Sequence, residues 1–307
     1  MFTQYLKNPR KRRVVLSYAQ DWLLVIVMIG VFFAIDVIPP FHREFSLQDK
    51  SIMYTYTAKE SVPAWTLALI CFLGPIIAIG FIAWHFQKSM HDFHSGVLAL
   101  SMVIMLTDII KITAGRPRPD FLARCQPPLD AQDPPRGLSN YTICTTPIDS
   151  YEMKDGYKSF PSGHASFSFA GLGYLAFYLA GKMQLFDERG HTYKCFLFAF
   201  PSIAALLVAI SRTRDYRHHW QDVFIGGLLG AGCAYFAYRQ YYPSLIHVES
   251  HNPYSARFGS CSDDPEQQEQ QLPAPGTIVY TSHDDGSSIT SSQLSTDDRY
   301  KHSYPVK

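Results

Sequence analysis

The fold class of this chain is decided first by one stretch of its sequence, WTLALICFLGPIIAIGFIAWHF at residues 65–86. Its only strongly polar side chain is that of His85, which lies one residue from the end. A helix needs about 20 consecutive apolar residues to cross the hydrocarbon core of a bilayer, and this stretch is long enough. It therefore predicts a transmembrane helix.

Five more apolar runs share this character, and together they predict an all-α, multi-pass membrane protein with a bundle of six transmembrane helices. The six runs are Trp22–Pro39, Trp65–Phe86, Phe93–Ile112, His164–Gly181, Cys195–Ile210 and Val223–Arg239. The last two runs are short, so they would also fit buried core helices of a soluble protein. Six such runs in one chain favour the membrane interpretation.

The composition agrees with a membrane body that is followed by a polar tail. Of the 307 residues only 17% are charged, which is below the roughly 25% of ordinary soluble domains. Residues 1–242 carry a net charge of +6, whereas residues 243–307 carry −5 and are rich in polar residues. The positive charge is spread over an apolar body, which argues against nucleic-acid binding. We expect residues 243–307 to form a disordered tail.

The charge pattern at the N-terminus predicts how the chain crosses the membrane. The basic residues that precede the first run are Lys7, Arg10, Lys11, Arg12 and Arg13. Such a cluster stays in the cytosol, so we expect residues 1–21 to form a basic cytosolic N-terminus. The first run is too long for a signal peptide and lacks a cleavage site. Six spans within residues 22–242 place the C-terminus in the cytosol too, and the loops 40–64, 113–163 and 211–222 on the lumenal or extracellular side.

The long loop 113–163 carries two features that suit an outer environment. Asn140-Tyr-Thr is an acceptor sequence for N-glycosylation. Cys125 and Cys144 are the only cysteines outside the predicted spans and the tail. An oxidising compartment permits a disulfide between them, worth about 3 kcal/mol for a loop of this size. Their spacing alone leaves free thiols open as the alternative.

Three short segments hold the polar residues that are suited to chemistry, and the parity of the spans places all three at the outer surface. The segments are Lys111–Pro119, Pro161–His164 and Ser211–Asp222. Lys111, Arg118 and Arg212 offer three cations, and the planar fork of arginine suits phosphate oxygens. Ser162 and Gly163 stand where a helix begins, and the free backbone N–H groups there bind anions. The segments predict a site for a tetrahedral dianion.

Two histidines in these segments suit opposite roles in a phosphoryl transfer. His218 and Asp222 are four residues apart and would share one helix face if the sixth helix begins early. The carboxylate of Asp222 would then accept a hydrogen bond from one nitrogen of His218 and leave the other nitrogen as a nucleophile. His164, on a different helix, is suited to protonate the leaving oxygen as a general acid.

Each of these residues also has an ordinary interpretation when it is taken alone. A histidine at a membrane interface is commonly a polar anchor, and arginine and lysine at span ends commonly reach the head groups. Asp222 would suit the N-terminus of a helix. His219 fits no catalytic role, and we assign it to the interface. The spacing of all three segments together favours the catalytic interpretation.

The three segments resemble the signatures of a known family. Residues 111–119 match Lys-x6-Arg-Pro, residues 161–164 match Pro-Ser-Gly-His, and residues 211–222 match Ser-Arg-x5-His-x3-Asp, in that order and without departure. These are the motifs of the type 2 phosphatidic acid phosphatase (PAP2, or lipid phosphate phosphatase) superfamily. The resemblance covers roughly residues 15–242, and residues 107–121 and 40–45 resemble the fungal diacylglycerol pyrophosphate and lipid phosphate phosphatases in particular.

The resemblance implies a fold and a reaction. The fold is a six-helix core of the type shared with the haloperoxidases, with its site on the lumenal or extracellular side. His218 would form a phosphohistidine, Asp222 would orient His218, and His164 would protonate the departing oxygen. The residues that would hold the phosphoryl oxygens are Lys111, Arg118, Ser162, Gly163 and Arg212. The resemblance implies no metal or other cofactor, because these cations take its place. The sequence agrees, since no cluster of His, Asp and Glu near the motifs has metal-ligand spacing.

The substrates implied by the resemblance are phospholipids from the bilayer, namely phosphatidate, lysophosphatidate and diacylglycerol pyrophosphate. A phosphatase of the same superfamily for polyprenyl diphosphate, sphingoid base phosphate or glucose 6-phosphate is the nearest alternative. A non-catalytic protein that binds or transports lipid phosphates is the alternative from another class. The vacuole, the Golgi, the endoplasmic reticulum and the plasma membrane all stay open as its location.

Overall fold

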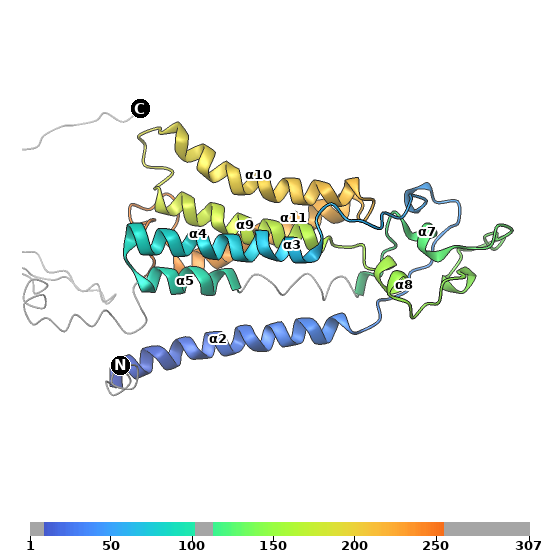
Figure 1. The fold of residues 1–307 in the computed structure, drawn as a ribbon, viewed down its shortest axis with the longest axis horizontal. Helices are drawn as coiled ribbons and strands as arrows, with labels where there is room; N and C mark the ends of the chain where they lie inside the picture. The colour runs from blue at the N-terminus through green and yellow to red at the C-terminus, as the bar shows by residue number, and fades with distance from the viewer. Residues whose placement is uncertain (1–8, 102–112, 255–307) are drawn as a thin grey trace, which may run out of the picture. The chain divides into compact units, whose positions relative to one another are not determined.

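The structure, a computed structural model, describes residues 9–101 and 113–254 of the chain (Figure 1). Within these ranges the chain forms helices joined by loops, and the only β-type pairing is an isolated antiparallel bridge between Phe45 and Ser139. The predicted all-α class is therefore confirmed for the described residues.

Long helices make up most of the described chain. They are α2 (Pro9–Asp36), α5 (Met90–Ser101), α9 (Gly163–Lys182), α10 (Thr192–Arg214) and α11 (Trp220–Tyr241). A further continuous helix is built from α3 (Ala64–Ala68), a π-helical turn (Leu69–Leu73), α4 (Gly74–Ile82) and a second π-helical turn (Ala83–Gln87). The short elements are α7 (Phe121–Cys125), α8 (Tyr151–Gly156) and two 3-10 turns, Lys50–Ile52 and Tyr141–Ile143.

Three of the described helices are long and apolar enough to cross a membrane. They cover Leu16–Ile35, Ala64–Phe86 and Thr192–Arg214. α9 and α11 coincide with the fourth and sixth predicted runs, but α9 lies inside the bundle and buries polar residues such as Ser166 and Ser168. The third run begins in α5 and continues into residues outside the described ranges. The count of six transmembrane helices stays a prediction.

The first predicted run, Trp22–Pro39, differs from the helix that the structure contains. α2 begins at Pro9 and ends at Asp36. Lysine, arginine and leucine are good helix formers, so the helix starts within the basic segment. Pro39 and Pro40 have no backbone N–H and cannot continue it. α2 contacts α5 through Trp22, whose Nε1 donates a 2.9 Å hydrogen bond to Nε2 of His94.

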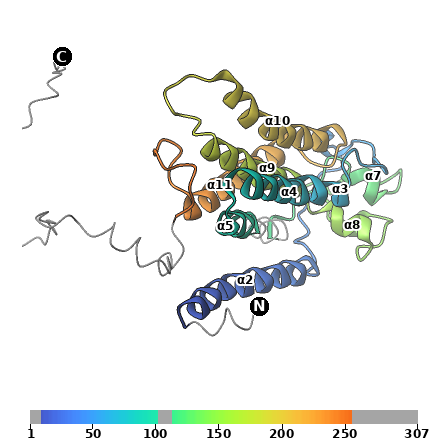
Figure 2. The same ribbon diagram turned by 60° about the vertical axis from the view of Figure 1, so that its left-hand side comes forward.

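α9 is the centre of the bundle, and its most extensive helix contacts are with α11 and α10 (Figure 1 and Figure 2). Two glycines of α11 permit the close approach to α9. A Cβ atom on Gly226 would lie 2.6 Å from the carbonyl oxygen of Ser162, and one on Gly230 would lie 2.2 Å from that of Ser166. Larger residues would push the helices apart. The packing thus holds the start of α9, with the second motif, against α11.

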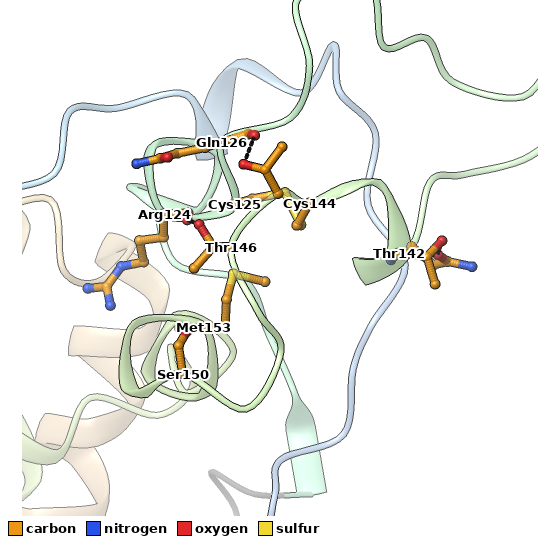
Figure 3. The surroundings of a disulfide bond; sticks show 10 residues. Arg124, Cys125, Gln126, Thr142, Cys144, Thr146, Ser150 and Met153 are labelled. Atoms are coloured by element: carbon orange, nitrogen blue, oxygen red, sulfur yellow. Dashed lines mark hydrogen bonds between the residues drawn. A yellow bond between two sulfur atoms is a disulfide. The ribbon is translucent and has the colours of Figure 1, made fainter.

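The loops at the motif end of the bundle have a small core of their own. The rings of Phe45 and Phe121 meet edge to face with their centroids 4.8 Å apart. The ring centroid of Tyr157 lies 4.7 Å from that of Phe121. A disulfide joins Cys125 and Cys144 and closes the loop of residues 126–143 (Figure 3). These contacts tie the segment before α3 to the segment between α5 and α9, so both segments are held over the ends of the helices.

The sequence predicts a polar tail from residue 243, but the structure folds residues 243–254 back against the helices. Lys182 Nζ in α9 donates a 2.6 Å hydrogen bond to the carbonyl oxygen of His251, and Tyr254 N–H donates to the carbonyl of Tyr241 at 2.9 Å. Ser250 is buried, and Leu245 packs against the core of the bundle. These contacts hold the segment despite its polar composition. Residues 255–307 lie outside the described residues.

Candidate active site

The second and third motif segments meet at the adjoining ends of α9, α10 and α11. Ser162 is the N-cap of α9, and Gly163 and His164 belong to its first turn. Arg212 lies in the last turn of α10, and Asp222 in the first turn of α11. The backbone N–H of Ser162 donates a 3.0 Å hydrogen bond to the carbonyl of Asp222. The two motifs therefore share one framework.

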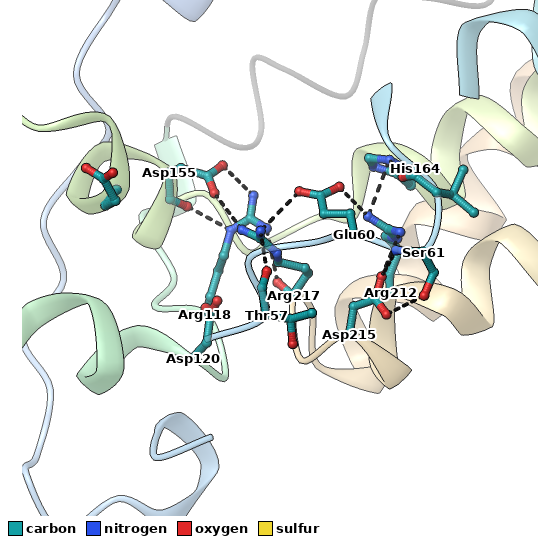
Figure 4. A network of polar contacts seen from close by, with 12 residues as sticks. Thr57, Glu60, Ser61, Arg118, Asp120, Asp155, His164, Arg212, Asp215 and Arg217 are labelled. Carbon is teal, nitrogen blue, oxygen red and sulfur yellow. Dashed lines mark hydrogen bonds and ion pairs between the residues drawn. The ribbon is translucent and has the colours of Figure 1, made fainter. Parts of the chain in front are cut away.

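Arg212 and His164 lie side by side in this site (Figure 4). Nη1 of Arg212, a residue that is only 1% exposed, is 3.4 Å from Nε2 of His164. The same Nε2 is 3.0 Å from the carbonyl oxygen of Val62. A carbonyl oxygen only accepts hydrogen bonds, so Nε2 of His164 carries a hydrogen. His164 therefore presents an N–H group beside a buried cation.

His218 lies in the turn between α10 and α11 and is almost completely buried. Its Nδ1 is 2.6 Å from the carbonyl oxygen of Ser159. Because that oxygen accepts, Nδ1 carries the hydrogen, and the lone pair of the neutral ring belongs to Nε2. Nε2 is therefore the nitrogen of His218 that can act as a nucleophile.

Asp222 is fully buried, and polar atoms of three side chains lie within hydrogen-bond distance of its carboxylate. Its oxygens lie 2.6 Å from Nη1 of Arg116, 2.6 Å from Oγ of Ser159 and 3.2 Å from Nδ1 of His219. Burial alone would raise the pKa of Asp222, but the hydrogen bonds from His219 and Ser159 and the charge of Arg116 outweigh it. The pKa of Asp222 is therefore lowered, and the carboxylate is ionised at neutral pH.

Ser159 connects His218 with Asp222. Its carbonyl oxygen accepts from Nδ1 of His218, while its hydroxyl donates to Oδ2 of Asp222. Sequence reasoning missed Ser159, because it lies two residues before the Pro-Ser-Gly-His segment and belongs to no signature. The orienting role of Asp222 stays a prediction, and the two hydrogen bonds of Ser159 join Asp222 to His218.

His219 has a structural role that its assignment to the interface missed. It is the N-cap of α11, and it forms a reciprocal capping box with Asp222 at the third position of the helix. A carboxylate in the first turn is also favoured by the helix dipole. α11 therefore begins at Trp220, which places Asp222 in its first turn but leaves His218 before the helix. The prediction that His218 and Asp222 share one helix face is wrong, because the cap at His219 starts the helix only after His218.

Arg118 belongs to a second group of buried charges beside Arg212 (Figure 4). Its Nε and Nη2 donate to the carbonyl and to Oδ1 of Asp155 at 2.8 and 2.6 Å. Arg217, which is 4% exposed, places Nη1 3.5 Å from Oδ2 of Asp155. Burial lowers the pKa of Arg118 and Asp155 offsets part of that effect, while a guanidinium stays charged at any physiological pH. Arg217 occupies a variable position of the third motif, so the motif did not reveal it.

Glu60 completes this group from a distant part of the chain. Its carboxylate pairs with Nη1 of Arg212 at 2.8 Å and with Nη2 of Arg217 at 3.3 Å. The next residue, Ser61, donates from its N–H and its hydroxyl to Asp215, which in turn pairs with Arg212. No sequence signal marks Glu60, because its contact with Arg212 spans 152 residues and exists only once the loop has folded.

Lys111, the remaining predicted cation, lies outside the described residues. The predicted site residues that the structure places at one end of the bundle are Arg118, Ser162, Gly163, His164, Arg212, His218 and Asp222. In the part of the chain that the structure describes, no group of three or more His, Cys, Asp and Glu side chains is placed to hold a metal ion. The arrangement is suited to bind a tetrahedral anion and to transfer a proton to or from it.

Comparisons with known proteins identify the family of this chain. The PAP2 superfamily model matches residues 94–245. Lipid phosphate phosphatase 1 of Arabidopsis thaliana is 39% identical over 249 residues, which are 79% of this chain and 74% of that protein. The probable diacylglycerol pyrophosphate phosphatase 1 of Schizosaccharomyces pombe is 39% identical over 231 residues, 74% of this chain and 82% of that protein.

Diacylglycerol pyrophosphate phosphatase 1 of Saccharomyces cerevisiae is 35% identical over 237 residues, which are 74% of this chain and 80% of that protein. No solved structure matches the chain. The matches to the relatives extend over most of the chain, and the region that matches the family model contains all three motif segments. This chain therefore belongs to the PAP2 superfamily.

Proposed function

We propose that this chain is a membrane-embedded lipid phosphate phosphatase that hydrolyses phosphatidate, lysophosphatidate or diacylglycerol pyrophosphate. The observation that carries the proposal is a pair of imidazoles, His218 and His164, at the end of a bundle that also buries Arg212. The relatives from Arabidopsis and the two yeasts are named as lipid phosphate or diacylglycerol pyrophosphate phosphatases, which supports the same substrate class here.

The proposed reaction has two steps. The lone pair on Nε2 of His218 attacks phosphorus, and the bond between phosphorus and the leaving oxygen breaks. The leaving oxygen keeps the electrons of that bond and receives a proton from the imidazolium of His164. Water then attacks the phosphohistidine while His164 accepts a proton from it. The phosphorus–nitrogen bond breaks, its electrons return to His218, and phosphate leaves. Asp222, held ionised by Arg116, orients His218 through Ser159 in this proposal.

The negative charge that grows on the phosphoryl oxygens would be stabilised by cations and by a helix N-terminus. Arg118 and Arg212, together with Lys111, would supply the positive charge. The first turn of α9, from Gly163 onward, would supply backbone N–H groups. Buried arginines act more strongly than exposed ones, because the surrounding dielectric constant is low. We therefore expect turnover to persist in the presence of a metal chelator.

An apolar groove next to the site favours a lipid over a sugar phosphate as the substrate. The groove has a volume of about 500 Å³ and lies between α10 and α11. Its lining runs from Thr213 and Trp220, next to the third motif, down to Leu206 and Ala231. The stretch of α11 from Trp220 to Ala231 rises about 16 Å, which is about half of the ~30 Å hydrocarbon core. An acyl chain of one leaflet would therefore fit while its phosphate reaches Arg212.

We further propose that residues 22–242 cross the membrane six times, with both termini in the cytosol and the site on the lumenal or extracellular side. The disulfide between Cys125 and Cys144 supports an oxidising environment for the loop that contains it. Asn140 is exposed in the same loop. Glycosidase treatment should lower the apparent mass of the wild-type chain but not that of Asn140→Gln, and a wild-type chain without a glycan would remove this support.

The test of the proposed function is phosphate release by purified protein in detergent with EDTA. Phosphatidate, diacylglycerol pyrophosphate, a polyprenyl diphosphate and glucose 6-phosphate would be offered to the wild type, to His218→Ala and to the exposed control His247→Ala. We expect release from the glycerolipids by the wild type and the control alone. Tight binding of phosphatidate without release would instead favour a binding or transport protein, and preference for another substrate would redefine the enzyme.

A further inference from the structure

One carboxylate in the anion site belongs to no motif. Glu60 places Oε2 2.8 Å from Nη1 of Arg212, and that nitrogen is also the one that lies 3.4 Å from Nε2 of His164 (Figure 4). Its other oxygen, Oε1, lies 3.3 Å from Nη2 of Arg217. A carboxylate and a phosphoryl group present similar pairs of oxygens to arginine. Glu60 therefore occupies a position that suits a substrate phosphate.

Glu60 differs from the other two carboxylates of this group in how firmly it is held. Asp215 accepts from the N–H and hydroxyl of Ser61 and has a side chain that is 5% exposed. Asp155 bridges several arginines and is 18% exposed. The Glu60 side chain is 29% exposed, and both of its ion pairs are with arginines at the site. It is the carboxylate that an incoming anion can most readily displace.

Arg217 supplies an independent observation. Its guanidinium is buried, and its Nε has no hydrogen-bond acceptor. Nη2 donates to the carbonyl oxygen of Thr57 at 2.9 Å and also pairs with Glu60. A buried donor without an acceptor is costly, and buried polar groups of this kind are rare in folded proteins. A phosphate group offers more acceptor positions than a carboxylate, so Arg217 has the capacity to bind one.

We propose that Glu60 is an internal competitor for the phosphate site, and that the substrate phosphate displaces it from Arg212 and Arg217. Arg217 then becomes a phosphate-binding residue in addition to those of the motifs. This inference rests on the proposed phosphatase function, because it names the ligand of the same site. It also gives a role to the carboxylate that pairs with both Arg212 and Arg217.

The competition would select for phosphomonoesters over phosphodiesters. A phosphomonoester carries about 1.5 to 2 negative charges at neutral pH and three free acceptor oxygens. The phosphodiester of an ordinary membrane phospholipid carries a single charge on two free oxygens, which does not exceed what Glu60 itself offers to Arg212 and Arg217. Glu60 would thereby keep abundant phosphodiester lipids out of the site without excluding phosphatidate.

The test is the binding of inorganic phosphate to the purified full chain, measured by titration calorimetry in detergent micelles. Glu60→Gln removes the competing charge and should tighten phosphate binding by between about 10- and 100-fold. This is the change in affinity that corresponds to one hydrogen bond to a charged group. Adding Arg217→Gln to that variant should cancel at least about tenfold of the gain. The exposed residue Glu44 lies in the same loop, and Glu44→Gln is the matched control that should bind as the wild type does.

Binding that is unchanged or weaker in Glu60→Gln would overturn the proposal, because a residue that only supports the arginines would weaken the site when altered. If Glu60→Gln does not fold, Glu60→Ala is expected to show the same gain, and failure of both to fold would assign Glu60 a structural role instead. Phosphate binding requires no turnover. An inactive wild type would therefore refute the proposed function, whereas an active wild type with unchanged binding in the variant would refute only this inference.

Discussion

Replacing Ser159 with alanine should raise the pH at which activity is lost on the acidic side. The Ser159 hydroxyl donates a 2.6 Å hydrogen bond to Asp222, and both side chains are fully buried. A hydrogen bond to a charged group contributes about 1.5–3 kcal/mol, and about 1.4 kcal/mol corresponds to one pH unit. The ionised form of Asp222 should therefore lose about 1.5–3 kcal/mol of stabilisation in Ser159→Ala, and its pKa, which is now lowered, should rise.

The direction of the effect follows from the ionisation of Asp222. Because its folded-state pKa is depressed, its stabilising contacts are complete above the unfolded pKa and are lost as the pH falls through the folded pKa. Removing the Ser159 hydroxyl moves this loss to a higher pH. The carbonyl of residue 159 remains and still accepts from His218, but the hydroxyl contact that joins Asp222 to this residue is lost, so we expect activity at neutral pH to fall as well.

The assay is kcat/KM for phosphate release from short-chain phosphatidate, measured against pH. Ser168→Ala is the matched control, because Ser168 is equally buried but donates to the backbone carbonyls of Ala165 and Ala205. We expect the acidic limb to move only in Ser159→Ala. An acidic limb that stays in place, or that moves equally in both variants, would refute the reasoning.

Three further predictions concern packing, the groove and the disulfide. Gly226→Ala should lower the stability of the protein in detergent by about 1–3 kcal/mol. Gly232→Ala should not, because a Cβ atom there has no neighbour within 4 Å, and equal melting temperatures of the two variants would contradict the close approach of α9 and α11. Ala231→Phe should lower kcat/KM for long-chain relative to short-chain phosphatidate, and the same ratio in Gly232→Phe would argue against an acyl groove. Replacing Cys125 and Cys144 with serine should lower the free energy of unfolding by about 3 kcal/mol, measured by thermal unfolding. A melting temperature of the wild type that does not change with reductant would be inconsistent with the disulfide.

The location of the site was predictable because its residues lie next to helix ends. The apolar runs at His164–Gly181 and Val223–Arg239 differ from α9 and α11 by only a few residues. Since Ser162 precedes one helix and Asp222 begins the other, two spans that run alongside each other bring them together. Gly226 and Gly230 permit that contact, because each leaves room for a carbonyl oxygen of the other helix.

The partners of the motif residues were not predictable in the same way. Glu60 reaches Arg212 from a loop, and Asp155 reaches Arg118 from the short helix α8, and both placements depend on tertiary contacts. No periodicity describes such loops, and a single acidic residue in a loop carries no pattern. The role of Ser159 was not predictable for a different reason. One of its two contacts, the one with His218, is made by a backbone carbonyl that any residue type could provide.

The boundaries of the helical body were the least accurate part of the prediction. Hydropathy located the apolar part of α2 but not its start, because a basic segment with good helix formers extends the helix to Pro9. At the other end, the polar composition of residues 243–254 indicated a tail. Their contacts with Lys182 and Tyr241 are made through backbone atoms, which composition does not report.

The most direct test of the central claim is to trap the phosphoryl group on the enzyme. Purified protein would be mixed with phosphatidate labelled with ³²P, quenched in alkali and mapped by mass spectrometry. We expect an alkali-stable, acid-labile label on His218 in the wild type, no label in His218→Ala, and label that decays more slowly in His164→Ala because the second step lacks its base. Label on another residue, or full turnover by His218→Ala, would contradict the account.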